Sequence, residues 1–398
     1  MKIDAHNFDL RLKNTVKKIE NSAISAANKK IILKFKDNCI TNGLGSARIE
    51  KYIQTLYSLA LMLKKDFEKA KKQDIIKLVS LIEKNNKWSD WTKHDYKLTI
   101  RKFFTWLRNS ETPPEEVSWI KLKVKNGNHK LPEELLTEEE VKRLIESAKD
   151  LRNKALIACL YESGCRIGEI LALKLKNIQF KDLGAQIIVE GKTGMRRVLL
   201  ISSVPYLSAW VNEHPDKNNP NAPLWVNKVN HEFLNYSACA SMLRDIAKKA
   251  EIKKRVNPHS FRHSRATHLA NHLTEAQMKQ YFGWVQGSDM ASVYVHLSGR
   301  DVDKAIMKVY GLEKESEKKE ESILKPKKCP RCDKLNPATA KLCNNCGLAL
   351  DVRTALEIEE RNKKFESIRK KIDSFIDEAI KRNPEIQKMM LMATQENE

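Results

Sequence analysis

The closely spaced cysteines near the C-terminus constrain the fold of this chain most. Cys329 and Cys332 form one C-x-x-C pair, and Cys343 and Cys346 form a second pair after ten intervening residues. Each pair can place two sulfurs on one turn, so four thiolates can close a tetrahedron around one zinc ion. Such a site has no open coordination position, so we expect a structural zinc ion and no catalytic metal. A redox role is the alternative, but no thioredoxin-like βαβ pattern surrounds the pairs.

The net charge indicates a polyanionic partner. The 398 residues include 73 Lys plus Arg and 51 Asp plus Glu, a formal net charge of +22. Residues 1–110 hold 24 basic and 11 acidic residues, a surplus of 24 − 11 = +13. A basic segment of this size is typical of nucleic-acid binding, although a generally lysine-rich surface is the alternative.

Composition also excludes several classes of protein. No apolar run approaches the ~18–20 residues that a membrane span needs, and the first residues lack the apolar core of a secretory signal. The paired cysteines favour metal binding in a reducing compartment. We therefore expect a cytoplasmic, nucleoid-associated protein with no membrane segment.

Changes in pattern along the chain divide it into segments and predict an α+β, mostly helical fold. A threonine at 137 with a glutamate at 140 forms a capping box that starts a new helix after a proline-containing basic stretch. Strand-like residues 185–190 and 196–202 flank a glycine-rich hairpin turn. Helices are expected at 8–36, from 47, at 72–84, 92–109, 151–162, 203–213, 231–250, 259–272 and 274–282, and in the tail from 353. The expected segments are a helical domain (1–112), a basic linker (113–135), a mixed domain with a small antiparallel sheet (136–312), a charged linker (313–326), a zinc ribbon (327–352) and a C-terminal helix (353–398).

Five basic or phenolic side chains of the mixed domain stand out as candidates for chemistry. His259 and Arg262 lie three residues apart near a helix start, which places them on one face. Arg166 follows a helix break, Lys192 lies in the hairpin turn, and Tyr294 lies on a short helix after a glycine-rich stretch. Each alone has an ordinary structural explanation, so the prediction depends on the set and its order.

This order resembles the tyrosine recombinase (phage integrase) family. The resemblance is strong over residues 135–312 and looser over 1–110, which resemble the family's helical core-binding domain that clamps DNA. The ribbon fused to a lysine-rich core suggests an archaeal type. Most members carry a second histidine where this chain has Trp284, which can still hold the phosphate pocket. The stretches that carry the resemblance are ESGCRIGEILALKLKNI, VEGKTGMRRVLL, NPHSFRHSRATHLA and YFGWVQGSDMASVYVHLS.

The resemblance implies a site-specific DNA recombinase or integrase that cleaves and rejoins DNA through a 3′-phosphotyrosyl intermediate, without a catalytic metal or a nucleotide. It implies that Arg166 and Arg262 bind the scissile phosphate and that Tyr294 is the nucleophile. His259 would accept a proton, and Lys192 would protonate the leaving 5′ oxygen. It also implies a homo-oligomer, a tetramer on two double-stranded DNA sites.

Other interpretations remain open from the sequence. A strand-relaxing topoisomerase would use similar chemistry, and a decayed integrase could be a non-catalytic DNA-binding protein; a dimeric transcription factor is a third alternative. Tyr281 and Tyr310 are rival nucleophiles, but Tyr281 is expected in the core and Tyr310 lies past the motif. The C-terminal helix is expected either to contact a neighbouring subunit or partner, or to be a solvated terminal helix.

Overall fold

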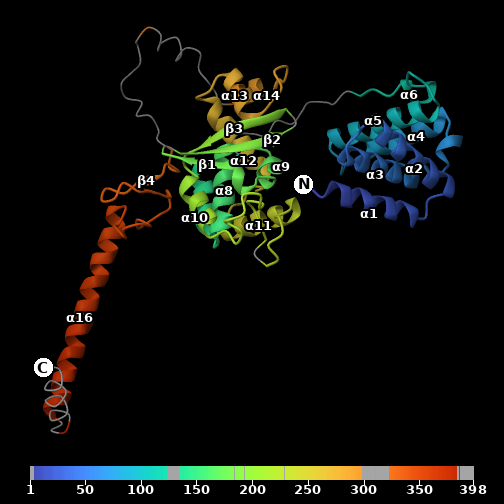
Figure 1. The fold of residues 1–398 in the computed structure, drawn as a ribbon. Helices are drawn as coiled ribbons and strands as arrows, with labels where there is room; N and C mark the ends of the chain where they lie inside the picture. The colour runs from blue at the N-terminus through green and yellow to red at the C-terminus, as the bar shows by residue number, and fades with distance from the viewer. Residues whose placement is uncertain are drawn as a thin grey trace. The chain divides into compact units, whose positions relative to one another are not determined.

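The computed structural model describes residues 4–122, 134–182, 184–191, 193–227, 229–297, 310, 322–382 and 385. It divides into two compact units, which are described separately (Figure 1). The first unit comprises Met1–Leu135 with Val226–Ser241, and the second comprises Leu136–Trp225 with Met242–Glu398. None of the described helices is long and apolar enough to cross a membrane.

The first unit is built from helices around an aromatic core. Phe35 and Phe67 both pack their rings against Phe103, with centroids 5.3 and 4.9 Å apart. The sequence predicted one helix over 8–36, which is wrong: residues 21–25 separate two helices, and Ser25 caps the second by accepting from the backbone N–H of Asn28. The elements are α1 (Phe8–Glu20), α2 (Ala26–Thr41), α3 (Ser46–Leu63), the 3₁₀ turn η1 (Phe67–Lys69), α4 (Lys72–Lys84), α5 (Asp90–Leu107) and α6 (Glu115–Ser118).

The second unit surrounds one buried helix, α8 (Leu151–Ser163), which packs against α7 (Glu138–Ser147), α10 (Val204–Asn212) and α12 (Pro258–Ala270). Nearly every residue of α8 is buried, as expected for a helix enclosed by others. Thr137 and Glu140 form the predicted capping box at the start of α7. The other helical elements are α7 (Glu138–Ser147), α9 (Ile167–Leu171), η3 (Leu175–Asn177), α10 (Val204–Asn212), α12 (Pro258–Ala270), α13 (Glu275–Phe282), α14 (Met290–Leu297) and α16 (Val352–Arg382), and α11 (Tyr236–Lys249) spans the boundary between the units.

A small antiparallel sheet lies in the second unit, with strand order β1 (Ile178–Lys181), β2 (Gly184–Gly191) and β3 (Gly194–Leu200). The register pairs Gly191 with Gly194, so the predicted hairpin is confirmed. Strand β1 was not predicted, because its mostly exposed side chains give no apolar alternation. A second, two-stranded sheet of β4 (Lys327–Lys328) and β5 (Leu335–Asn336) lies among the cysteines.

The predicted fold class, α+β and mostly helical, is confirmed. The six segment boundaries stay predictions, since much of both linkers lies outside the described residues. The expected basic linker contains the short helix α6 in its described part. The expected C-terminal helix is described up to Arg382, as α16.

Candidate active site and candidate metal site

Arg166 owes its position to the glycine that ends α8. Gly164 adopts a left-handed conformation (φ +54°), and a Cβ there would lie 2.4 Å from Cε1 of Phe282. Only glycine permits this turn without displacing the ring. The chain then enters α9 with Arg166 as its N-cap, and Glu169 accepts from the Arg166 backbone N–H at 2.9 Å. The helix break seen in the sequence therefore places Arg166 at the start of α9.

Glu169 links Arg166 to a second arginine that the sequence analysis did not select. Its carboxylate accepts from Arg166 Nη1 at 3.1 Å and from Arg196 Nη2 at 2.7 Å, and Glu169 is buried. Burial raises the pKa of Glu169, but hydrogen bonds and charge from Arg196, together with the hydrogen bonds from Arg166, lower it overall below its ordinary value. The alternation of side chains along the strand could have indicated Arg196, because this arginine shares the inward face of β3 with Val198 and Leu200.

Arg262 is buried and is held by backbone carbonyls. Its Nη1 donates to the carbonyl of Gly164 and its Nη2 to that of Phe282, each at 2.9 Å. Its guanidinium carbon lies 5.5 Å from the centroid of the Trp284 ring. Burial and then the positive charge of Arg166 lower the pKa of Arg262 to about 10. Among the described residues, no carboxylate forms an ion pair with Arg262.

The carbonyls at the end of α13 bring both arginines and the hairpin turn together. Both terminal nitrogens of Arg166 donate to the carbonyl of Gly283 at 3.3 Å, next to the carbonyl that holds Arg262. Thr193 Oγ1, in the hairpin turn, donates to the same Gly283 carbonyl at 3.3 Å. The predicted site residue Lys192, beside Thr193, lies outside the described residues.

Tyr294 lies on α14 and its side chain is buried. Its ring stacks on Trp284, with centroids 5.5 Å apart and planes 1° from parallel. Its hydroxyl forms a hydrogen bond with Nδ1 of His263, a residue that the sequence analysis quoted in a motif but did not select. Burial, opposed by the charge of Arg262, raises the pKa of Tyr294 to about 12. His259 is exposed, and its ring centroid lies 6.5 Å from that of His263.

Four of the predicted residues therefore form a continuous set of contacts: Arg166 and Arg262 on consecutive carbonyls, then Trp284, then Tyr294. The rival Tyr281 instead donates its hydroxyl to the carbonyl of Glu162 at 2.9 Å, as expected for a core residue.

We call Arg166, Arg196, Arg262 and Glu169 the arginine centre. It holds three guanidinium groups and one carboxylate, a local surplus of two positive charges. Planar guanidinium donors in this number suit an oxyanion with several acceptor oxygens, such as a phosphodiester.

The four predicted metal ligands come together as a cysteine cluster, made of Cys329, Cys332, Cys343 and Cys346. Their sulfurs all lie within 4.8 Å of one another, and two pairs are 3.5 and 3.6 Å apart. Tetrahedral thiolates at ~2.3 Å from a zinc ion would have sulfurs about 3.8 Å apart. The geometry therefore fits a structural metal held by four thiolates. The segment that carries the cysteines also contacts α10, because Oγ1 of Thr339 forms a hydrogen bond with the hydroxyl of Tyr206 at 2.9 Å.

Several known proteins with related sequences are named tyrosine recombinases. Residues 134–300 match the phage integrase family. The chain is 25% identical over 274 residues to the tyrosine recombinase XerD of Oceanobacillus iheyensis, covering 65% of this chain and 90% of that protein. It is 31% identical over 193 residues to the tyrosine recombinase XerA of Pyrococcus furiosus, covering 47% of this chain and 66% of that protein.

Solved structures with the same fold include proteins crystallised with DNA. The XerH site-specific recombinase in a post-cleavage complex with a palindromic difH substrate aligns with a TM-score of 0.53 and 20% identity, over 77% of this chain and 97% of that one. A lambda integrase dimer bound to a COC′ core site aligns with a TM-score of 0.55 and 14% identity, over 68% and 78%. These similarities show the fold.

Proposed function

The chain belongs to the tyrosine recombinase, or phage integrase, family, and from this premise we propose that it is a site-specific DNA recombinase or integrase in which Tyr294 is the nucleophile. The observation that carries the proposal is the arginine centre. Arg262 is buried beside a second arginine and has no carboxylate in an ion pair among the described residues. Burying a charge in this way is costly unless a counter-charge joins it. A DNA phosphate supplies that charge.

Arg166 and Arg262 would bind the non-bridging oxygens of the scissile phosphate. Each presents a planar fork of donors that matches the oxygens of a phosphate. Cations fixed where negative charge develops are usually the largest single term in catalysis. Glu169 and Arg196 do not need to touch DNA in this scheme, because their ion pair fixes the direction of Arg166.

Tyr294 would attack the phosphorus, forming a bond from its phenolic oxygen to the 3′ phosphate while the 5′ oxygen leaves. With a pKa of about 12 in its buried position, the hydroxyl stays protonated at neutral pH and needs a proton acceptor. His259 is proposed as that acceptor, and Lys192 as the donor to the leaving 5′ oxygen. The phosphotyrosyl bond then accepts attack by a DNA 5′-hydroxyl, which rejoins the strand without ATP.

Double-stranded DNA is the proposed partner, bound by the basic first unit and by the arginine centre. Phosphate contacts of this kind release counterions, so affinity should fall steeply with added salt. The related XerH and lambda integrase structures are complexes with their DNA sites. We propose a tetramer on two DNA sites, acting on the nucleoid in the cytoplasm.

The cysteine cluster is proposed to hold one zinc ion that stabilises the ribbon. Four thiolates at these separations match zinc coordination, and the closed site gives the ion a structural role. Metal binding would supply folding free energy that the short segment lacks on its own.

The test is covalent capture of a nicked suicide DNA substrate that traps the tyrosyl intermediate. Tyr294→Phe should abolish the trapped complex and retain DNA binding, because only the attacking oxygen is removed. Tyr281→Phe is the matched control: it removes a partly buried tyrosine hydroxyl on α13 and should still permit capture. Capture by the Tyr294→Phe variant would refute the assignment, and no capture by the unaltered chain would favour a non-catalytic DNA-binding protein.

A further inference from the structure

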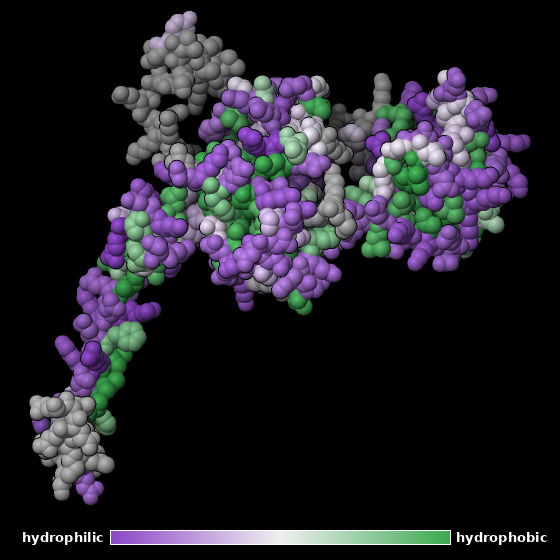
Figure 2. Space-filling view, in the orientation of Figure 1, coloured by the Kyte–Doolittle hydropathy of each residue, from purple (hydrophilic) through white to green (hydrophobic). Residues whose placement is uncertain are grey.

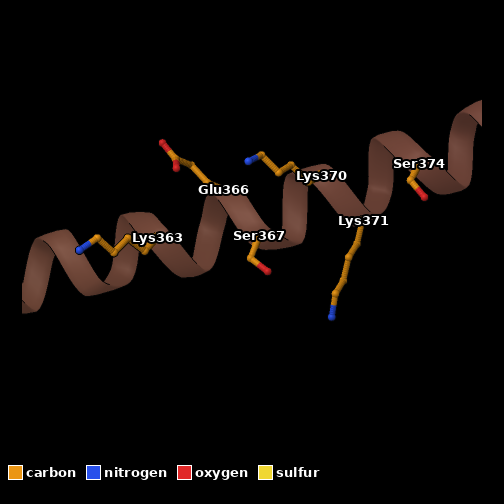
Figure 3. Close-up of a pocket in the computed structure, with 6 residues that line it drawn as sticks. All are labelled: Lys363, Glu366, Ser367, Lys370, Lys371 and Ser374. Carbon is orange, nitrogen blue, oxygen red and sulfur yellow. The ribbon is translucent and has the colours of Figure 1, made fainter.

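Helix α16 exposes a row of large apolar side chains that the proposed chemistry does not use. Phe365, Ile368, Ile372 and Phe375 are between 52% and 74% exposed. Figure 2 shows hydrophobic side chains gathered along one side of α16. The rest of the helix surface is polar, and Figure 3 shows side chains projecting from it: Lys363, Glu366, Ser367, Lys370 and Ser374 lie away from the apolar face, and Lys371 lies at its border. A contiguous apolar face on an exposed helix indicates a surface that another element covers.

The spacing of this face is that of a coiled coil. Phe365, Ile372 and Ala379 repeat every seven residues as heptad a positions, and Ile368 and Phe375 occupy the intervening d positions. Alternating spacings of three and four residues produce a narrow seam that fits a second helix with the same spacing. We call these five residues the α16 seam. Arginines at the neighbouring d positions, 361 and 382, limit its length.

Charges beside the seam disfavour a parallel pair. In parallel pairing, each g residue faces the e residue five positions later on the other helix. Lys364 at g would then face Arg369 at e, on both sides of the pair. Like charges in these positions oppose pairing.

The same charges favour an antiparallel pair in one register. In antiparallel pairing, a positions face d positions and g positions face g positions. When Ile372 faces the partner's Phe375, Ile368 faces the partner's Ala379 and Lys371 faces the partner's Glu378. In this register Phe365, at the end of the seam, faces the partner's Arg382. A shift of one heptad in either direction would set Lys371 against the partner's Lys371, or Glu378 against the partner's Glu378.

We propose that α16 is a dimerisation helix, whose seam pairs antiparallel with the seam of a second copy of this chain. The pairing joins two chains through their C-terminal helices in the absence of DNA. The dimerisation proposal depends only on the sequence and exposure of α16. It can therefore be tested independently of the recombinase activity.

Sedimentation velocity of the full-length chain without DNA tests this proposal. We expect a concentration-dependent species of twice the 45.9 kDa chain mass. Ile372→Glu, which would bury a charge at the seam centre, should weaken dimerisation by roughly 100-fold or more. Ser367→Glu adds the same charge on the polar side and should leave dimerisation unchanged. Far-UV circular dichroism checks that both variants keep the helix.

A charge swap tests the orientation. Lys371→Glu should weaken the dimer by roughly 3- to 10-fold, and adding Glu378→Lys should restore it. A parallel pair would not respond in this way, because Lys371 would face the partner's Ile376. A monomeric full-length chain, or a dimer unaffected by Ile372→Glu, would overturn the proposal; a charge swap that fails to restore the dimer would overturn its antiparallel register.

Discussion

The arginine centre and the cysteine cluster each gather side chains that repel one another when charged. The arginine centre holds three guanidinium groups, two of them bonded to one carboxylate, whereas the cluster holds four sulfurs within 4.8 Å. Their access differs: the Arg166 side chain remains 34% exposed, whereas four thiolates around a metal would leave no open position.

The difference in access suits the two sites to different ions, a substrate anion that binds and leaves and a structural metal that stays bound. An open positive site can take up an anion and release it, which a reaction on DNA requires. A closed set of thiolates keeps its metal and converts binding into stability.

The largest expected effect is on the cluster. Cys329→Ser should abolish metal binding, whose apparent free energy is ~10–16 kcal/mol in small zinc domains. Hydrogen exchange across 327–351 should become fast, while capture of a suicide substrate continues. Elemental analysis measures the metal, and Cys39→Ser, a buried cysteine of the first unit, is the control. Unchanged metal content in Cys329→Ser would show that the cluster is not the metal site.

The next effect is on the open site. Arg262→Lys should slow DNA cleavage ~10²–10³-fold, because a single ammonium cannot keep both carbonyl contacts and also present a fork to the phosphate. Single-turnover cleavage on saturating DNA measures this. Arg265→Lys, on the same helix, should have little effect on the rate. Equal losses in the two variants would mean that Arg262 has no special place in the site.

Glu169→Gln should destabilise the second unit by about 3 kcal/mol near neutral pH, since it leaves the partly buried Arg196 without its counter-charge. Because the folded-state pKa of Glu169 is lowered, its stabilising effect is present above the ordinary pKa and is lost as the pH falls through the folded value. The stability gap between the variant and the unaltered chain should therefore narrow on acidification below about pH 4.5. Denaturant unfolding at several pH values measures it, and a gap that widens in acid would contradict this account.

The smallest effect concerns the hairpin turn. Thr193→Ala removes the hydroxyl that bonds to the Gly283 carbonyl, beside the arginines. A net contribution of ~0.5–1.5 kcal/mol predicts cleavage about 2- to 13-fold slower, with DNA affinity nearly unchanged. An unchanged cleavage rate would indicate that this contact does not position the turn for catalysis.

Local pattern predicted most of the elements and supplied the residues proposed for the site, but not the contacts that support them. Helix α4 has the predicted bounds, because Ile75, Leu78, Val79 and Ile82 repeat with helical spacing and are all buried. The break between α1 and α2 was missed, because apolar and basic residues continue on both sides of the capping serine.

The missed site residues depend on contacts between distant segments. Arg196 bonds to Glu169 across 27 residues, and His263 bonds to Tyr294 across 31. Such pairs form only when a strand or a helix packs against another element, so spacing within one element does not predict them. Arg166, Arg262 and Tyr294 could be selected because short motifs surround each of them.

The central claim is that Tyr294 attacks a phosphate bound by the arginine centre. Its most direct test is mass spectrometry of the proteolysed covalent complex formed on a suicide substrate. The account predicts one modified peptide, with the DNA 3′ phosphate attached to Tyr294. Attachment to another residue, or through a 5′ phosphate, would contradict it.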